Sequence, residues 1–308
     1  MNRDIGVIIV TYNRLDKLKT TLDKFDKQTL KPKYVMVVDN ASTDMTGEYL
    51  SQWYNDDKDY EKYIVTNATN EGGSGGFYAG LKNAMQKKAD WIWVSDDDAF
   101  PDENALYEAN KFLKKCHNVD NISAICGAVI NNGKIDVLHR KNLIKSGFGI
   151  KEVFVKEEEY EKESFELNGF SYVGTIINKN MLQKVGVTEK KYFIWWDDTE
   201  HSIRLSKVGK ILCVPSIKIT HDTGYVDNEV TWKTYYGIRN MLDLYRKHFP
   251  RICYLYEWNK LYIKLCIKIL FRINKSSHKI LKEALMDCKN EKFGIHEVYK
   301  PGWKIEKN

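Results

Sequence analysis

The sequence has no paired-cysteine motif and no apolar run long enough to cross a membrane. Its six cysteines are scattered, and no two of them are separated by two residues. This spacing excludes the common zinc sites and a disulfide framework, and it fits a reducing cytosol. No run approaches the roughly 18 apolar residues of a membrane-spanning helix. Residues 1–4 lead straight into a strand-like run, so we expect no signal peptide and a cytoplasmic protein.

The net charge of +6 is concentrated near the C-terminus. Residues 251–308 carry 13 Lys/Arg and 6 Asp/Glu, whereas the first 250 residues carry 35 and 36. An anionic partner is therefore expected at the tail. No nucleic-acid-binding motif accompanies the charge, so nucleic acid is not expected. A composition of 43% hydrophobic and 29% charged residues indicates a globular chain of one large domain with an appendage.

The first hundred residues alternate between strand-like and helix-like patterns. Residues 5–10, 34–39 and 63–66 are largely apolar and typical of strands, and leucines recur at helical spacing after the first of them. This alternation predicts an α/β fold with a doubly wound, mostly parallel sheet. Further strands are expected over 122–130 and 170–177.

Two downstream segments complete the coarse prediction. A short helix is expected near residues 181–185. Residues 131–168 carry mixed charges and are expected to form an exposed loop.

Three consecutive acids, Asp96, Asp97 and Asp98, follow a short apolar run. They are expected at the carboxyl end of a buried strand, where open α/β sheets bind ligands. In an extended chain Asp96 and Asp98 point the same way and Asp97 points away. Two carboxylates on one side suit a hard divalent cation that keeps positions open for diphosphate oxygens. The alternative is a solvated acidic turn before a helix that begins near Asp102.

A glycine-rich segment precedes the acids, with five glycines in the nine residues 72–80. A helix is expected from about Phe77 to Lys88, and the amides at its start can face a phosphate. The alternative is a flexible loop. The segment is not a Walker A motif, because no Gly-Lys-Ser/Thr ends it. It is not the dinucleotide fingerprint either, because it does not follow the first strand.

A second acidic segment, residues 195–200, reads Trp-Trp-Asp-Asp-Thr-Glu. An acid beside large aromatic side chains is partly desolvated, which raises its pKa towards that of a useful general base. The alternative is that Asp197 or Asp198 caps the following helix. His221 comes directly after strand-like residues 217–220. It is either a structural histidine or a third metal ligand beside the first acidic cluster.

Four segments, in order, resemble the inverting family 2 glycosyltransferases of the GT-A fold. They are residues 7–14, 37–44, 96–98 and 196–200, and the resemblance covers about residues 4–225. The resemblance implies Mn²⁺ or Mg²⁺ held by Asp96, Asp98 and His221. It implies the following donor-binding residues: Thr11, Asn13, Arg14, Asp39, Asn70, Gly73, Gly76, Asp96 and Asp97. The resemblance implies that Asp198 is the catalytic base, with Asp197 and Glu200 as alternatives. It also implies that Trp195 and Trp196 lie on the acceptor side.

Within that family the sequence is most similar to galactofuranosyltransferases and some rhamnosyltransferases of bacterial surface glycan synthesis. This similarity implies transfer from UDP-galactofuranose to a hydroxyl of a lipid-linked or cell-surface glycan, in one displacement that inverts configuration. The alternatives are a dTDP-rhamnose-dependent transferase, another UDP-hexose transferase, a nucleotidyltransferase, and a nucleotide-sugar-binding module without turnover.

The C-terminal part is expected to be a separate helical region. We place the catalytic domain at residues 1–226 and a basic region, contacting acceptor or membrane, at 227–308. Residues 230–245 predict one helix. An apolar stripe then recurs at helical spacing: Tyr254, Trp258, Leu261, Leu265 and Ile269. A basic stripe accompanies it: Lys260, Lys264, Lys268 and Arg272.

This amphipathic pattern suits a peripheral position on an anionic membrane through residues 251–290, on the inner face of the cell membrane. The alternative is a helix that packs on the catalytic domain and exposes a solvated basic face.

Overall fold

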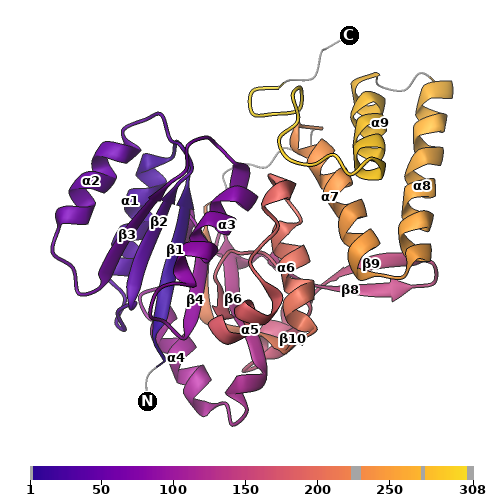
Figure 1. Ribbon diagram of the computed structural model, residues 1–308. Helices are drawn as coiled ribbons and strands as arrows, with labels where there is room; N and C mark the ends of the chain where they lie inside the picture. The colour runs from indigo at the N-terminus through magenta and orange to yellow at the C-terminus, as the bar shows by residue number, and fades with distance from the viewer. Residues whose placement is uncertain (1–2, 223–229, 272–274, 304–308) are drawn as a thin grey trace.

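The computed structural model describes residues 3–222, 230–271 and 275–303 (Figure 1). Strands and helices alternate through its first part as the sequence predicts. The elements are β1 (Ile5–Thr11), α1 (Leu15–Asp26), β2 (Tyr34–Asp39), α2 (Thr46–Asn55), β3 (Glu61–Thr66), α3 (Gly72–Ala84), β4 (Trp91–Asp96), β5 (Ala99–Pro101), α4 (Ala105–Lys115) and β6 (Ile122–Asn131).

One large sheet forms the centre of the molecule, with strand order β10-β13-β6-β12-β4-β1-β2-β3. Strand β1 pairs in parallel with β2 and β4, and β13 pairs in parallel with β6. The short strand β12 (Thr175–Asn178) runs antiparallel between β4 and β6. Every residue of β1 and β2 is buried, because helices cover both faces of the sheet (Figure 1). The mostly parallel α/β prediction is confirmed.

The glycine-rich segment is part of a helix. Helix α3 begins at Gly72, five residues before the expected start at Phe77. A Cβ atom on Gly76 would lie 2.4 Å from Cγ1 of Val10, and one on Gly80 would lie 2.5 Å from Cγ2 of Ile8. These two glycines therefore let α3 lie directly against β1, so the flexible-loop alternative is wrong.

Residues 131–168 are also more ordered than expected. They contain the short strand β7 (Lys134–Ile135), the hairpin of β8 (Arg140–Ser146) and β9 (Gly149–Phe154), and β10 (Phe165–Leu167). Arg140 is fully buried at the base of the hairpin. Its guanidinium donates to the carbonyls of Gly127 and Val173, so it ties the hairpin to the sheet.

The strand expected over 170–177 is divided into β11 (Gly169–Phe170) and β12. The carbonyls of Ser171 and Val173, which lie between the two strands, accept hydrogen bonds from Arg140 instead of from a neighbouring strand. The rest of the catalytic part comprises α5 (Lys179–Val185), α6 (Asp197–Ser206) and the long strand β13 (Lys210–His221).

The described residues of the C-terminal region contain three helices: α7 (Lys233–His248), α8 (Arg251–Leu270) and α9 (Lys275–Lys289). Four members of the predicted apolar stripe pack in a cluster with side chains of α7 and α9: Tyr254, Trp258, Leu261 and Leu265. Packing is therefore the role of this stripe, although Ile269 is 52% exposed. Arg272 and the domain boundary between residues 226 and 227 lie outside the described residues.

None of the helices that the structure describes combines the length and the apolar character that crossing a membrane requires.

Candidate active site

A cavity of about 1150 Å³ lies at the carboxyl ends of the central strands. It gathers eight of the residues predicted from sequence: Arg14, Gly73, Asp96, Asp98, Trp195, Asp197, Asp198 and His221. These residues come from five different segments of the chain. The doubly wound sheet therefore brings both acidic segments and the glycine-rich helix start to one place, as open α/β sheets do.

The first acidic segment and His221 form a compact group. One ligand atom from each of Asp96, Asp98 and His221 lies within 4.8 Å of the other two. Strand β4 ends at Asp96, and β13 ends at His221, which pairs with Ala99 of β5. The Nδ1 atom of His221 is buried and has no hydrogen-bond partner among the described residues. Two carboxylates and an imidazole whose Nδ1 atom is buried and unpartnered fit a divalent cation.

The electrostatics of the group favour a cation as well. Burial, together with the neighbouring charge of Asp98, raises the pKa of Asp96 to about 7. Burial also acts on Asp98, but its hydrogen bond to His221 and the charge of Arg14 bring the pKa of Asp98 below its ordinary value. A bound cation would relieve the repulsion between the two carboxylates.

Asp97 is not part of this group, although it lies beside Asp98 in the turn between β4 and β5. Its carboxylate accepts a hydrogen bond of 2.8 Å from Thr11 Oγ1 and lies 3.2 Å from Nη1 of Arg14. The same nitrogen lies 2.7 Å from Oδ2 of Asp98. Asp97 and Thr11 are both buried, and neither lines the cavity. Thr11 therefore orients Asp97, and Asp97 holds Arg14 at the rim of the cavity.

Three other predicted donor-binding residues shape loops beside the cavity. Asp39 Oδ1 accepts from the amide of Ser42 at 2.9 Å. Asn13, in a left-handed conformation with φ of 53°, accepts from the amide of Thr43 at 2.7 Å. These two residues fix the turn after β2, and Asn13 and Arg14 line a second hollow that Asp98 shares.

Asn70 acts in the same way at the next loop. Its Oδ1 accepts from the amide of Gly72 at 2.9 Å, at the first residue of α3. Gly73 lines the cavity, whereas Gly76 packs on β1.

The second acidic segment enters the cavity through an unusual turn. Trp195 and Trp196 both have positive φ, 65° and 70°, which is rare and costly for bulky residues. Trp196 is the N-cap of α6 and makes no side-chain capping bond, so neither aspartate is the cap. Asp197 and Asp198 instead begin the helix and line the cavity.

Burial sets the ionisation of both acids. It raises the pKa of Asp198 against the opposing charge of Lys141. It raises the pKa of Asp197 well above the ordinary range, with the neighbouring Asp198 adding to the effect.

The two tryptophans separate in space. Trp195 is 47% exposed and lines the cavity. Trp196 packs edge-on against Tyr245, and the Nζ atom of Lys141 lies 4.9 Å from its ring centre. Only Trp195 is therefore positioned to contact a ligand in the cavity.

Glu200 does not reach the cavity. It is 1% exposed, and its carboxylate lies 3.0 Å from Nε of Arg204 and 2.8 Å from Nε2 of His248. These contacts hold α6 against α7.

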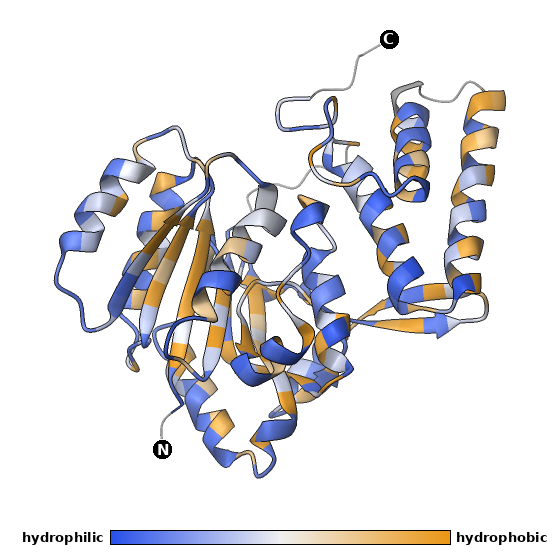
Figure 2. Ribbon diagram, viewed as in Figure 1, coloured by the Kyte–Doolittle hydropathy of each residue, from blue (hydrophilic) through white to orange (hydrophobic). Residues whose placement is uncertain are grey.

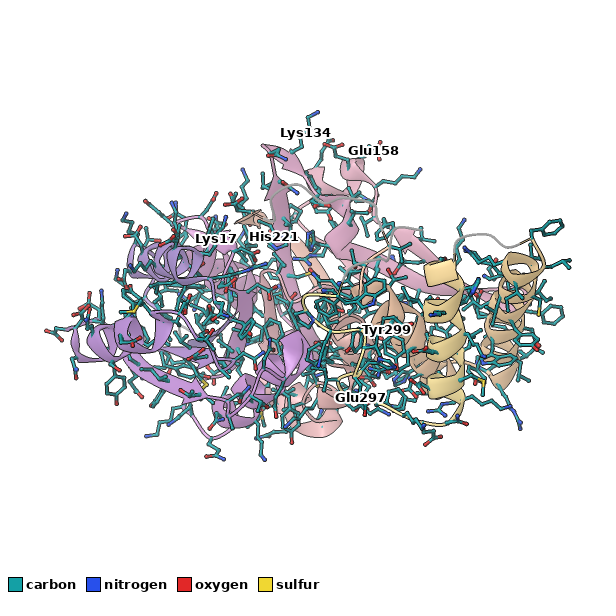
Figure 3. The ribbon with its side chains drawn as sticks, turned by 90° about the horizontal axis from the view of Figure 1, so that it is seen from above. Lys17, Lys134, Glu158, His221, Glu297 and Tyr299 are labelled. Carbon is teal, nitrogen blue, oxygen red and sulfur yellow. The ribbon has the colours of Figure 1, made fainter. Side chains whose placement is uncertain are left out.

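Sequence reasoning missed several residues at the site. Lys233, the first residue of α7, lines the cavity, where burial and the charge of Arg14 lower its pKa. His139 packs its ring edge-on against His221 at 5.0 Å between centres. Lys17 forms an ion pair with Asp222, and Figure 3 shows Lys17 and His221 near one another at this edge. No local pattern marks these residues, because folding alone brings them together.

Comparison with known proteins identifies the family. Residues 6–186 match the family model for glycosyl transferase family 2. The chain is 24% identical over 207 residues to a galactofuranosyltransferase of Mycolicibacterium smegmatis. This alignment covers 67% of this chain and 66% of that protein, so the chain spans just under two thirds of the length of that relative. It is 27% identical over 273 residues to a dTDP-rhamnosyl transferase of Shigella flexneri, covering 83% and 85%.

Solved structures show the same architecture. S. aureus TarS, solved with UDP-GlcNAc, matches with a TM-score of 0.59 and 15% identity, over 92% of this chain and 81% of that one. GalNAc-T7, solved with UDP, GalNAc and Mn²⁺, matches with a TM-score of 0.58 and 16% identity, over 80% and 48%. The GT-A fold prediction is confirmed, and the chain belongs to glycosyl transferase family 2.

Proposed function

We propose that this protein transfers a hexose from a nucleotide sugar, UDP-galactofuranose, to a hydroxyl of a glycan, with inversion at the anomeric carbon. One observation carries the proposal: the Asp96–Asp98–His221 group and the Asp197–Asp198 pair line the same cavity. A cation-binding group and a separate carboxylate base are the two components that such a displacement needs.

Asp96, Asp98 and His221 would hold Mn²⁺ or Mg²⁺. When bound, the ion supplies Lewis-acid stabilisation of the charge on the departing nucleoside diphosphate. The chain adds cations of its own for that charge, because Arg14 and Lys233 both line the cavity. Gly73 lies there too, in the first turn of α3, where backbone amides favour an anion.

Asp198 is the proposed base. It accepts the proton of the acceptor hydroxyl as that oxygen bonds to the anomeric carbon. The bond between that carbon and the diphosphate oxygen breaks, and its electron pair leaves with the nucleoside diphosphate. Trp195 offers an exposed aromatic face for the acceptor sugar. Asp197 is the alternative base, whereas the ion pairs of Glu200 leave it no access to a substrate.

A dTDP-rhamnose donor is the second candidate. The relative from Shigella flexneri supports it, because that dTDP-rhamnosyl transferase aligns over more of this chain than the galactofuranosyltransferase does. The two donors require the same cavity and base, so the choice depends on a few pocket contacts.

We further propose a lipid-linked or cell-surface glycan as acceptor, with residues 251–290 resting on an anionic membrane. The excess of basic over acidic residues after residue 250 supports this contact.

Calorimetry with UDP, UDP-galactofuranose, UDP-galactopyranose, UDP-GlcNAc and dTDP-rhamnose, with and without Mn²⁺, tests the function. We expect Mn²⁺-dependent binding of uridine nucleotides, tightest for the furanose, and slow hydrolysis of that donor. Tighter binding of dTDP-rhamnose selects the second candidate. Absence of nucleotide binding under every condition rejects the transferase proposal.

A further inference from the structure

Helix α8 has a second apolar face, which no part of the described chain covers. The face opposite its packed stripe carries large side chains that are 45–75% exposed: Ile252, Ile263, Ile267 and Leu270. Successive members of this set are eleven, four and three residues apart. At 3.6 residues per turn, each of these steps is close to a whole number of turns, so the four side chains lie on one side of the helix. Figure 2 shows apolar residues along most of α8, which lies at the edge of the molecule. A surface helix normally has one apolar face, and that one is already packed on α7 and α9.

The β8–β9 hairpin continues this surface. Phe148 at its tip is 66% exposed, and Ile144 is 49% exposed. The hairpin runs beside the first turns of α8 (Figure 1), where a Cβ on Gly149 would lie 3.1 Å from the ring of Tyr256. The β8–β9 hairpin and α8, which are distant in sequence, therefore present exposed apolar side chains next to each other. Together these side chains form a larger patch than scattered surface residues do.

The charges around this surface have one sign. The exposed charged residues of α8 are Arg251, Lys260 and Lys264, and those of the hairpin tip are Lys145 and Lys151. Residues 144–151 and 251–271, all of which the structure describes, contain no exposed carboxylate. The single acid in these segments, Glu257, is 6% exposed. A second copy of the chain would bring like charges together on this face, whereas an anionic surface would complement them.

We propose that the exposed face of α8 and the tip of the β8–β9 hairpin together form a surface that rests on an anionic lipid bilayer. Apolar side chains enter the boundary between headgroups and acyl chains, and the lysines lie at the level of the lipid phosphates. This inference rests on the membrane contact proposed above and identifies the residues that make it. It also assigns a role to the hairpin, which the sequence left as a loop.

Flotation of the full chain with vesicles tests the surface. The probes are vesicles of phosphatidylcholine alone and vesicles that also contain phosphatidylglycerol. We expect the wild type to float with the anionic vesicles only. The double variant I263E/I267E, and Phe148→Glu separately, should each reduce the bound fraction at least about tenfold, because they remove apolar contacts and add repulsion. Tyr54→Glu is the matched control, since Tyr54 is a 51% exposed aromatic on α2, and it should float like the wild type.

Two further readouts separate the alternatives. Mn²⁺-dependent donor hydrolysis in detergent-free buffer should be equal in all variants, which shows that they fold. If the wild type floats with the anionic vesicles and the variants lose this binding, but no protein hydrolyses the donor, the transferase proposal is rejected and this surface is kept. The surface is overturned if the wild type ignores anionic vesicles or if the variants float unchanged. It is also overturned if light scattering reveals a dimer that the variants dissociate, because the face then joins two copies.

Discussion

The Nε2 atom of His221 lies 3.3 Å from Oδ1 of Asp98, although the two residues are far apart along the chain. Strand β13 pairs antiparallel with β5, so its last residue ends beside the acidic end of β4. This pairing turns two separate sequence features into one candidate cation site.

Removal of either partner should weaken metal-dependent nucleotide binding. We expect Asp98→Asn and His221→Gln each to reduce the affinity for UDP in Mn²⁺ at least about tenfold, because metal sites are sensitive even to changes around their ligands. Chelation of the metal by EDTA should have the same effect on the wild type. Calorimetry measures these affinities. Asp102→Asn is the control, because Asp102 is an exposed acid beyond the site. Equal affinity of all three variants for UDP in Mn²⁺ would contradict the metal site.

Asp198→Asn should abolish turnover and leave UDP binding unchanged. Loss of a general base costs about 100-fold or more in rate, and the neutral amide keeps the size of the side chain. Steady-state kinetics and calorimetry on the same preparation separate the two effects. If Asp197→Asn shows the larger loss of kcat and Asp198→Asn remains active, the base is Asp197.

Lys141→Met should move the acid limb of the pH–rate profile to higher pH. Burial raises the pKa of Asp198, and the charge of Lys141 opposes that rise. Without Lys141 the pKa of Asp198 rises further. The negative charge of Glu152, which also raises this pKa, is then no longer opposed by Lys141. The base must be ionised to act, so kcat/KM falls at a higher pH than in the wild type. Lys151→Met, an exposed lysine on β9, should leave the profile in place, and an unshifted Lys141→Met profile would argue against Asp198 as the base.

Glu200→Gln should reduce stability at neutral pH and make it less sensitive to acid. Burial disfavours the charge of Glu200, but His248 and Arg204 overcome this and lower its pKa from 4.5 to about 2. This shift corresponds to about 3 kcal/mol of unfolding free energy, fully present above pH 4.5 and lost as the pH falls towards 2. Urea unfolding at pH 7 and at pH 3 measures it.

The difference between wild type and Glu200→Gln should therefore shrink at the lower pH. Glu159→Gln removes a surface ion pair with Lys162 and should change stability by less than about 0.5 kcal/mol at both values. If the difference in unfolding free energy between Glu200→Gln and the wild type is the same at pH 7 and pH 3, the loss of stability comes from packing and not from ionisation.

Gly76→Ala should destabilise the fold. The new methyl group would meet Cγ1 of Val10 at 2.4 Å, so α3 must move away from β1 at a cost of about 1–3 kcal/mol. Gly47→Ala, in α2, meets no atom within 4 Å and should stabilise by a few tenths to about 1 kcal/mol. Thermal unfolding compares the pair, and equal melting temperatures would show that α3 accommodates the methyl group freely.

The sequence by itself determined the sheet and the position of its acids. Continuous apolar runs such as residues 5–10 become strands wherever both faces are covered. The run before the acids does the same and ends at Asp96, which leaves the acids at the carboxyl end of a strand. The sequence therefore sufficed to predict the α/β class and eight of the residues that line the cavity. The α/β class follows from local periodicity, and the place of the acids follows from the rule that ligands bind at carboxyl strand ends. The GT-A fold followed from the resemblance to family 2 glycosyltransferases.

Only the tertiary structure decided what each side chain faces. Glu200 and Asp198 are two residues apart and chemically alike, yet one joins His248 in the protein interior and the other lines the cavity. Lys233 has no local signal, and the covered face of α8 is fixed by α7 and α9. Such outcomes depend on which distant segments pack together, because burial and ion pairing are set by neighbours in space and not by neighbours along the chain.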